Sequence, residues 1–131
     1  MDYQIYISTP KDTEESSPLI TTVHLTPGLI CGGFLFFPSG PAGNLHVVIK
    51  RKLTQILPVN QGSNYALDDC VVPLHFNLPI YDHPVLLDIC TWNDSSTYDH
   101  ALTVGIFLDP FVNPTTSKKS KTLFSRLFSK G

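Results

Sequence analysis

Short segments of alternating apolar and polar residues, separated by turn residues, make up most of this chain. Tyr3, Ile5 and Ile7 share one face of an expected first strand. Further strands are expected at residues 19–25, 29–37, 45–52, 53–59, 70–78, 85–92 and 101–108. No apolar period of 3.6 extends over a helix length before residue 115. The pattern predicts an all-β chain that forms a single antiparallel β-sandwich of about eight strands, and it leaves jelly-roll and Ig-like order open.

Two of these segments carry further signals. Residues 29–37 are nearly all apolar, which predicts that both faces of the strand are covered. Gly32 and Gly33 within it indicate a bulge or a close approach of another backbone. Pro73 indicates an edge strand or a bulge at 70–78, because proline cannot donate a hydrogen bond to a neighbouring strand.

Charge divides the chain into two parts. Residues 1–117 hold four bases and eleven acids, a formal −7, whereas residues 118–131 hold five bases and no acid. Charged residues are only 15% of the chain, against roughly 25% in ordinary soluble domains. Such a low content of charged residues favours a protein whose surface is covered by other copies of itself or by partner proteins. The alternative is a compact domain whose surface consists mostly of Ser, Thr, Asn and Gln. We expect a β-sandwich domain at 1–111, a linker at 112–117 and a basic amphipathic tail at 118–131.

The apolar side chains of the tail gather on one side of a helical wheel. Leu123, Phe124, Leu127 and Phe128 fall within about 140° of one another. The bases lie outside that arc, and they are Lys118, Lys119, Lys121, Arg126 and Lys130. Such a segment can enter a groove on another protein, lie on an anionic membrane surface or touch nucleic acid, and we rank these partners in that order. The alternative is a solvated terminus without a role.

No catalytic, metal or cofactor constellation is predicted. The histidines lack a ligand spacing, the loop aspartates fit no calcium-binding loop, and no nucleotide-binding, nucleophile-elbow or zinc-protease motif occurs. A hydrolytic pair of Asp68 and Asp88 is conceivable, but nothing in the spacing selects it. Three widely separated cysteines, each inside or beside an apolar strand, indicate buried reduced thiols. Residues 1–17 lack the apolar segment of a signal peptide, so we expect synthesis in a host cytoplasm without export.

The segment TWNDSSTYDH holds a candidate ligand loop. Trp92, Asn93, Asp94 and Tyr98 combine aromatic rings with amide and carboxylate groups, the side chains with which proteins bind sugars. In the alternative, which we favour, Trp92 fills space in the interior while Asn93 and Asp94 turn the chain.

The run LTPGLICGGFLFFPSGPAGNLHVVIKRKLTQILPVN and the later TWNDSSTYDHALTVGIFL resemble small β-sandwich proteins encoded by viruses and phages of bacteria and archaea. The resemblance covers residues 18–109 and rests on the FPSGPAG turn and the WN…H-x-L-T-V ending. It implies a minor capsid, spike or other virion-surface role, and it implies no catalytic residues.

Together these features predict a non-enzymatic structural protein that builds or decorates a virion or shell. We expect self-association or contact with other structural proteins, with the tail tethering the domain to a neighbouring protein or an enclosed membrane. The rival prediction is a glycan- or receptor-binding β-sandwich module that uses the Trp92 loop.

Overall fold

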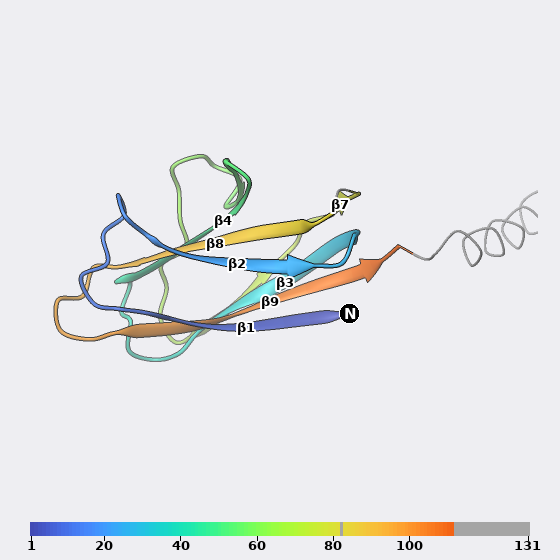
Figure 1. Cartoon of the computed structure of the whole chain (residues 1–131). Coiled ribbons are helices and arrows are strands. Elements are labelled where there is room, and N and C mark those ends of the chain that lie inside the picture. Colours follow the sequence, from blue (N-terminus) through green and yellow to red (C-terminus); the bar gives the residue numbers. More distant parts are fainter. Residues whose placement is uncertain (82, 112–131) are drawn as a thin grey trace, which may run out of the picture.

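Two antiparallel sheets lie face to face in the computed structural model, which describes residues 1–81 and 83–111 (Figure 1). Sheet A has the order β1 (Asp2–Thr9), β9 (His100–Pro110), β3 (Gly28–Phe37) and β6 (Cys70–Leu74), and β7 (Leu78–Ile80) also pairs with β3. Sheet B has the order β2 (Leu19–Leu25), β8 (Val85–Asn93), β4 (Leu45–Arg51) and β5 (Thr54–Leu57). The predicted all-β sandwich is therefore confirmed.

Strands β1 to β4 alternate between the two sheets along the chain, which decides between the two topologies. Strand β1 lies in sheet A, β2 in sheet B, β3 in sheet A and β4 in sheet B. In an Ig-like sandwich the first two strands are neighbours in one sheet. The observed order is that of a jelly roll in which β6 and β7 together take the place of one strand beside β3.

Some expected strand bounds are wrong. The single strand expected at 70–78 is two strands, because residues 75–77 leave the ladder between β6 and β7. The described residues therefore form nine strands where eight were expected. Strand β5 covers only four residues of the expected 53–59, because Leu53 lies in a turn and Pro58 follows Leu57. Strand β8 continues through Asn93, which was expected to turn the chain.

The glycines of β3 allow a very close pairing with β9. The register between these strands shifts between Ile30 and Gly32, which confirms the predicted bulge. A Cβ atom on Gly33 would overlap the carbonyl oxygen of Gly105, so the predicted close backbone approach is also confirmed. Pro73 lies on β6, at the edge of the main path of sheet A, as predicted.

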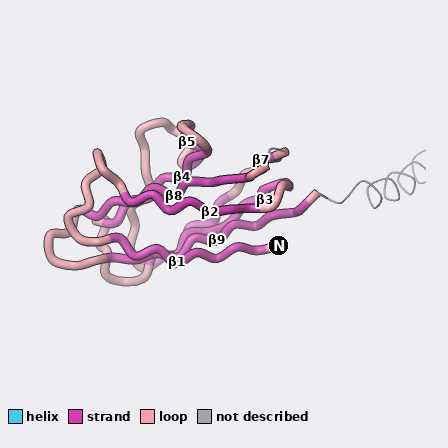
Figure 2. Tube along the Cα trace, in the orientation of Figure 1, coloured by secondary structure: helices cyan, strands magenta, loops and turns pink. Residues whose placement is uncertain are grey.

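The core lies between the sheets and contains the inward side chains of both. Its fully buried members include Ile30, Leu35, Phe37, Leu45, Val47, Ile49, Ile89, Leu102 and Val104. The β1–β2, β3–β4 and β8–β9 connections gather at one end (Figure 2). Near that end the Thr9 hydroxyl donates to the Thr91 hydroxyl oxygen at 2.8 Å, a buried link between β1 in sheet A and β8 in sheet B.

The linker 112–117 and the tail residues Lys118 to Lys130 named above lie outside the described residues. Among the residues that are described, no helix is long and apolar enough to cross a membrane.

Substitutions at the two close-packed glycines should have different costs. Gly33→Ala should lower the free energy of unfolding by about 1–3 kcal/mol, because its methyl group meets the backbone of β9. The methyl group of Gly105→Ala would meet the ring of Phe34. The loss of unfolding free energy caused by Gly105→Ala should therefore be smaller in a Phe34→Ala background. Urea denaturation of the four variants measures both effects. A Gly105→Ala cost that is unchanged by Phe34→Ala would contradict the ring contact.

Candidate functional site

Loops of the chain itself cover much of the outer face of sheet B. Val48, Cys90 and Trp92 are buried although they alternate with core residues of β4 and β8 and so point away from the core. One covering loop reaches β4 through backbone hydrogen bonds between Tyr65 and Val47. The other follows β1 and pairs at Thr13 with Asn93. The two loops leave a recess between them.

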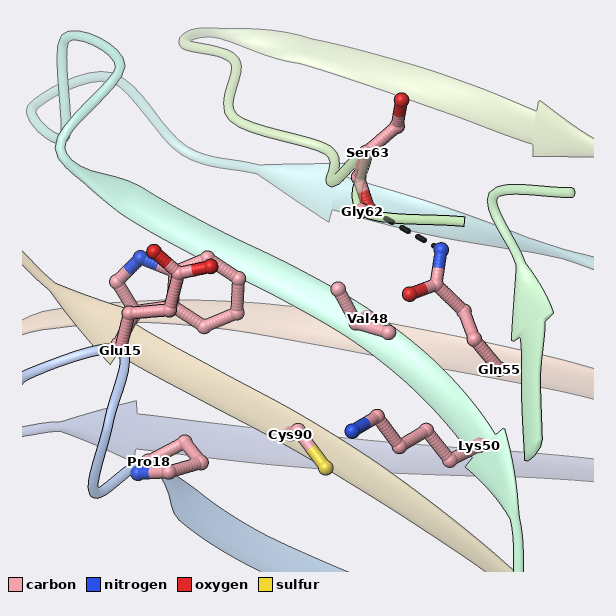
Figure 3. Close-up of a pocket in the computed structure, with 9 residues that line it drawn as sticks. Glu15, Pro18, Val48, Lys50, Gln55, Gly62, Ser63 and Cys90 are labelled. Carbon is pink, nitrogen blue, oxygen red and sulfur yellow. Dashed lines mark hydrogen bonds between the residues drawn. The ribbon is translucent and has the colours of Figure 1, made fainter. Parts of the chain in front are cut away.

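This recess is a cavity of about 150 Å³ whose floor is Val48 and Cys90 (Figure 3). Its full lining is Glu15, Pro18, Val48, Lys50, Gln55, Gly62, Ser63, Cys90 and Trp92. The Gln55 amide donates to the carbonyl oxygens of Pro58, Asn60 and Ser63 at 2.8 to 3.2 Å. Gln55 therefore holds the loop that forms one wall. The volume suits a few water molecules or a very small polar ligand.

Cys90 is the only thiol in the lining of this recess. Burial raises the pKa of its thiol; the charge of nearby Lys50 acts in the opposite direction but is the smaller influence. A thiol with a raised pKa stays protonated at neutral pH and is a weak nucleophile. The recess therefore gives no support to thiolate chemistry.

Trp92, the aromatic centre of the candidate ligand loop, is only 6% exposed. Its ring stacks on His46, with 5.1 Å between centroids and 3° between planes. The His46 Nδ1 lies 2.7 Å from the Asn64 amide oxygen, and the Nε2 lies 2.7 Å from an Asp94 carboxylate oxygen. His46 thus connects the β5–β6 loop at Asn64 with the β8–β9 loop at Asp94, over the end of sheet B. Its ring also occupies a face of Trp92 that a sugar ring would need.

The other members of the ligand loop differ in accessibility. Asn93 is fully buried and donates to the carbonyl oxygens of Thr9 and Tyr98, and its own amide oxygen accepts from the Ser95 N–H. Tyr98 is 67% exposed. Asp94 is exposed as well, although its carboxylate is bonded to His46. The ligand-loop hypothesis therefore rests on Tyr98 and Asp94.

The two aspartates considered as a catalytic pair have separate structural partners. An Asp68 oxygen accepts the N–H groups of Gly40 and Ala42, both at 2.9 Å, within the FPSGPAG turn. These two hydrogen bonds lower the pKa of the Asp68 carboxyl. Asp88 accepts from the Thr22 hydroxyl at 2.8 Å on sheet B. Among the described residues, no three His, Cys, Asp or Glu side chains gather as metal ligands would.

The outer face of sheet A differs from that of sheet B, because apolar side chains lie open on it. Across the sheet, Val71 of β6 pairs with Phe36, Phe36 with Thr103, and Thr103 with Tyr6 of β1. The next row runs from Pro73 through Phe34 and Gly105 to Gln4, and in the third Phe107 lies opposite Asp2 and Gly32. We call these outward residues the sheet A face: Gln4, Tyr6, Phe34, Phe36, Val71, Pro73, Thr103, Gly105 and Phe107.

The sheet A face as defined contains no charged residue, although Asp2, which also points outward in the third row, borders it at one end. Much of the face meets solvent. Tyr6 is 74% exposed, Val71 59%, Phe36 41% and Phe107 37%. Phe34 and Phe107 are in contact, with ring centroids 6.0 Å apart. The expectation that both faces of the strand at 29–37 are covered is therefore wrong for the single chain. The alternation of Phe34 and Phe36 with Leu35 and Phe37 carried this signal in the sequence, since every second side chain points outward.

Comparison with protein-family models, with curated proteins and with solved structures finds no match to this chain.

Two substitutions in the candidate loop separate a structural role from an exposed one. Asn93→Ala should lower the free energy of unfolding by about 1–3 kcal/mol, because it leaves buried backbone groups without partners. Tyr98→Ala should change stability little, because the side chain is exposed. Thermal and urea denaturation measure both values. Equal costs for the two variants would contradict the assignment of Asn93 as the structural member.

Proposed function

We propose that this chain is a non-enzymatic structural module that builds or decorates a larger assembly, and that the sheet A face is its contact surface. The observation that carries the proposal is an uncharged, aromatic-rich face formed by four neighbouring strands and left open in the single chain. Folded monomers rarely expose large contiguous apolar patches, and those that do commonly use them to bind.

The residue types on this face are those that stabilise protein interfaces. Tyr and Phe are enriched in interface cores, where charged residues are depleted. Burial of a side chain such as Phe36 or Val71 stabilises a complex by about 1.5–3 kcal/mol before the costs of association are counted. Several such residues in adjacent rows can therefore support a stable contact with another protein.

A virion or virion-like shell is the assembly that we propose. The jelly-roll order supports it, since this architecture occurs in viral capsid subunits, although it also occurs in lectins. The resemblance of residues 18–109 to virion-surface modules points the same way. Fold alone does not establish function, so the proposal depends on the sheet A face. The basic tail at 118–131 would tether the domain to a neighbouring protein or to an enclosed membrane.

Glycan binding remains the alternative. Its remaining support is the exposed ring of Tyr98 beside Asp94, together with the occurrence of jelly rolls among lectins. A glycan array that shows saturable binding abolished by Tyr98→Ala would favour this alternative over assembly.

Native mass measured by light scattering over a range of concentrations tests the proposed function. The mass of the full-length protein should rise with concentration, whereas Val71→Lys and Tyr6→Lys should remain monomeric because each places a charge in the apolar face. Leu53→Lys is the matched control, because Leu53 is 98% exposed in a turn and is not part of the sheet A face.

The control should assemble as the unmodified protein does. A full-length protein that stays monomeric at every concentration, or a Leu53→Lys variant as impaired as Val71→Lys, would contradict assembly through this face. Circular dichroism of each variant verifies that the sandwich is intact.

A further inference from the structure

We infer that the basic tail, residues 118–131, of a second copy of this chain occupies the sheet A face. This inference rests on the proposed function and names the partner of the same surface. It follows from the chemistry of the face, the sequence of the tail and the position at which the described chain ends.

The apolar part of the tail matches the apolar part of the face. The tail has two Leu-Phe pairs, Leu123–Phe124 and Leu127–Phe128, which share one arc of a helical wheel. The face offers the rings of Tyr6, Phe34, Phe36 and Phe107 with Val71 and Pro73 beside them. An amphipathic segment that lays such an arc on an apolar surface is a common mode of recognition between proteins.

The charges are complementary as well. The only charged side chains on the described strands of sheet A that flank this face are Asp2, opposite Phe107, and Asp109, opposite Leu29. The positively charged amino group of Met1 also lies at this end, where it donates to the Leu108 carbonyl oxygen. One positive and two negative groups leave this end of the face with a net negative charge. All five bases of the tail lie outside its apolar arc. A bound tail could therefore place Lys or Arg near Asp2 and Asp109 while its Leu and Phe side chains contact the rings.

A second copy would also present an identical uncharged face, and two such faces could pack together. That arrangement would bring Asp2 and Asp109 of both copies to one interface without a basic partner from the face. The tail supplies the missing positive charge, so charge complementarity favours the tail as occupant.

The described chain ends at one end of the sandwich and not over its own sheet A face. The Phe111 N–H donates to the Pro27 carbonyl oxygen at 3.2 Å, and the Phe111 ring stacks on Tyr81 with centroids 4.9 Å apart. Pro27 lies in the turn from β2 to β3, and Tyr81 follows β7, so both contacts lie where the chain crosses between the sheets. Phe111 is thus held at the end of the sandwich. The eleven residues from 112 to 122 then span up to about 36 Å when extended, enough to reach a neighbouring copy.

Contacts in which one copy's tail binds the next copy's face are heterologous, and they generate rings or open chains. A complementation experiment with full-length proteins uses this property. The face variant Val71→Lys keeps an intact tail, and the tail variant Phe124→Asp with Phe128→Asp keeps an intact face. Each should be monomeric alone by light scattering. Their mixture should form a 1:1 pair that does not grow further, because only one tail and one face remain functional.

Ser125→Asp with Ser129→Asp is the matched control for the tail variant. It makes the same charge change, but both positions lie outside the apolar arc, so it should assemble with at most a modest loss. Raising the salt concentration should weaken the pair, since charge contacts at the rim are screened.

The remaining outcomes overturn the inference in distinguishable ways. If the tail variant assembles as the unmodified protein does while Val71→Lys does not, the face binds something other than the tail, and the proposed function stands. If the tail variant is monomeric but the mixture forms no pair, the tail acts at another surface. If the unmodified protein is monomeric and yet the mixture forms a pair, the tail covers its own face, and self-assembly fails with the inference. If neither variant differs from the unmodified protein, the proposed function itself fails.

Discussion

The close pairing of β3 with β9 is the constraint on which the rest of the structure depends. Gly33 and Gly105 bring the two backbones so near that a methyl group at Gly33 would overlap the carbonyl oxygen of Gly105. The ring of Phe34 then fills the space that a side chain at Gly105 would take. The same two glycines therefore fix the centre of sheet A and place an aromatic ring on its outer surface, where Phe107 and Phe36 extend the apolar area.

The two sheets of the sandwich have different outer faces for a physical reason. Sheet B pairs with segments of the β1–β2 and β5–β6 loops at Thr13 and Tyr65, and these loops cover Val48, Cys90 and Trp92. Among the described residues, no comparable segment covers Phe36, Val71 and Tyr6 of sheet A. An apolar surface of this kind is stabilised when it is removed from water, so the contrast directs attention to an occupant of sheet A.

Much of the fold follows from local pattern, whereas the surfaces depend on tertiary arrangement. Alternation and turn residues were sufficient to predict a sandwich. Gly32, Gly33 and Pro73 also marked the bulge and the edge strand, because the missing Cβ of glycine and the missing N–H of proline act on the backbone directly. The choice of a jelly roll needed the pairing partners of each strand, which alternation cannot give. The position of Trp92 likewise depended on His46, which is 46 residues away in the sequence. The local sequence around Trp92 is equally compatible with an exposed ligand loop and with a buried ring that stacks on another residue.

Cys31 provides the most direct measurement of whether the sheet A face is covered in the assembled protein. It borders the sheet A face at the β3 bulge, where its sulfur lies 3.4 Å from the carbonyl oxygen of Phe107. Cys31 is exposed, so the prediction of a buried thiol is wrong for it, whereas Cys90 is buried and Cys70 is partly buried. We would measure the rate of maleimide labelling at Cys31 across the concentrations at which the native mass rises, with Cys31→Ser to identify the signal. Covering of the face predicts that labelling slows as the mass increases. An unchanged rate in fully assembled protein would show that this face remains open and would contradict the account.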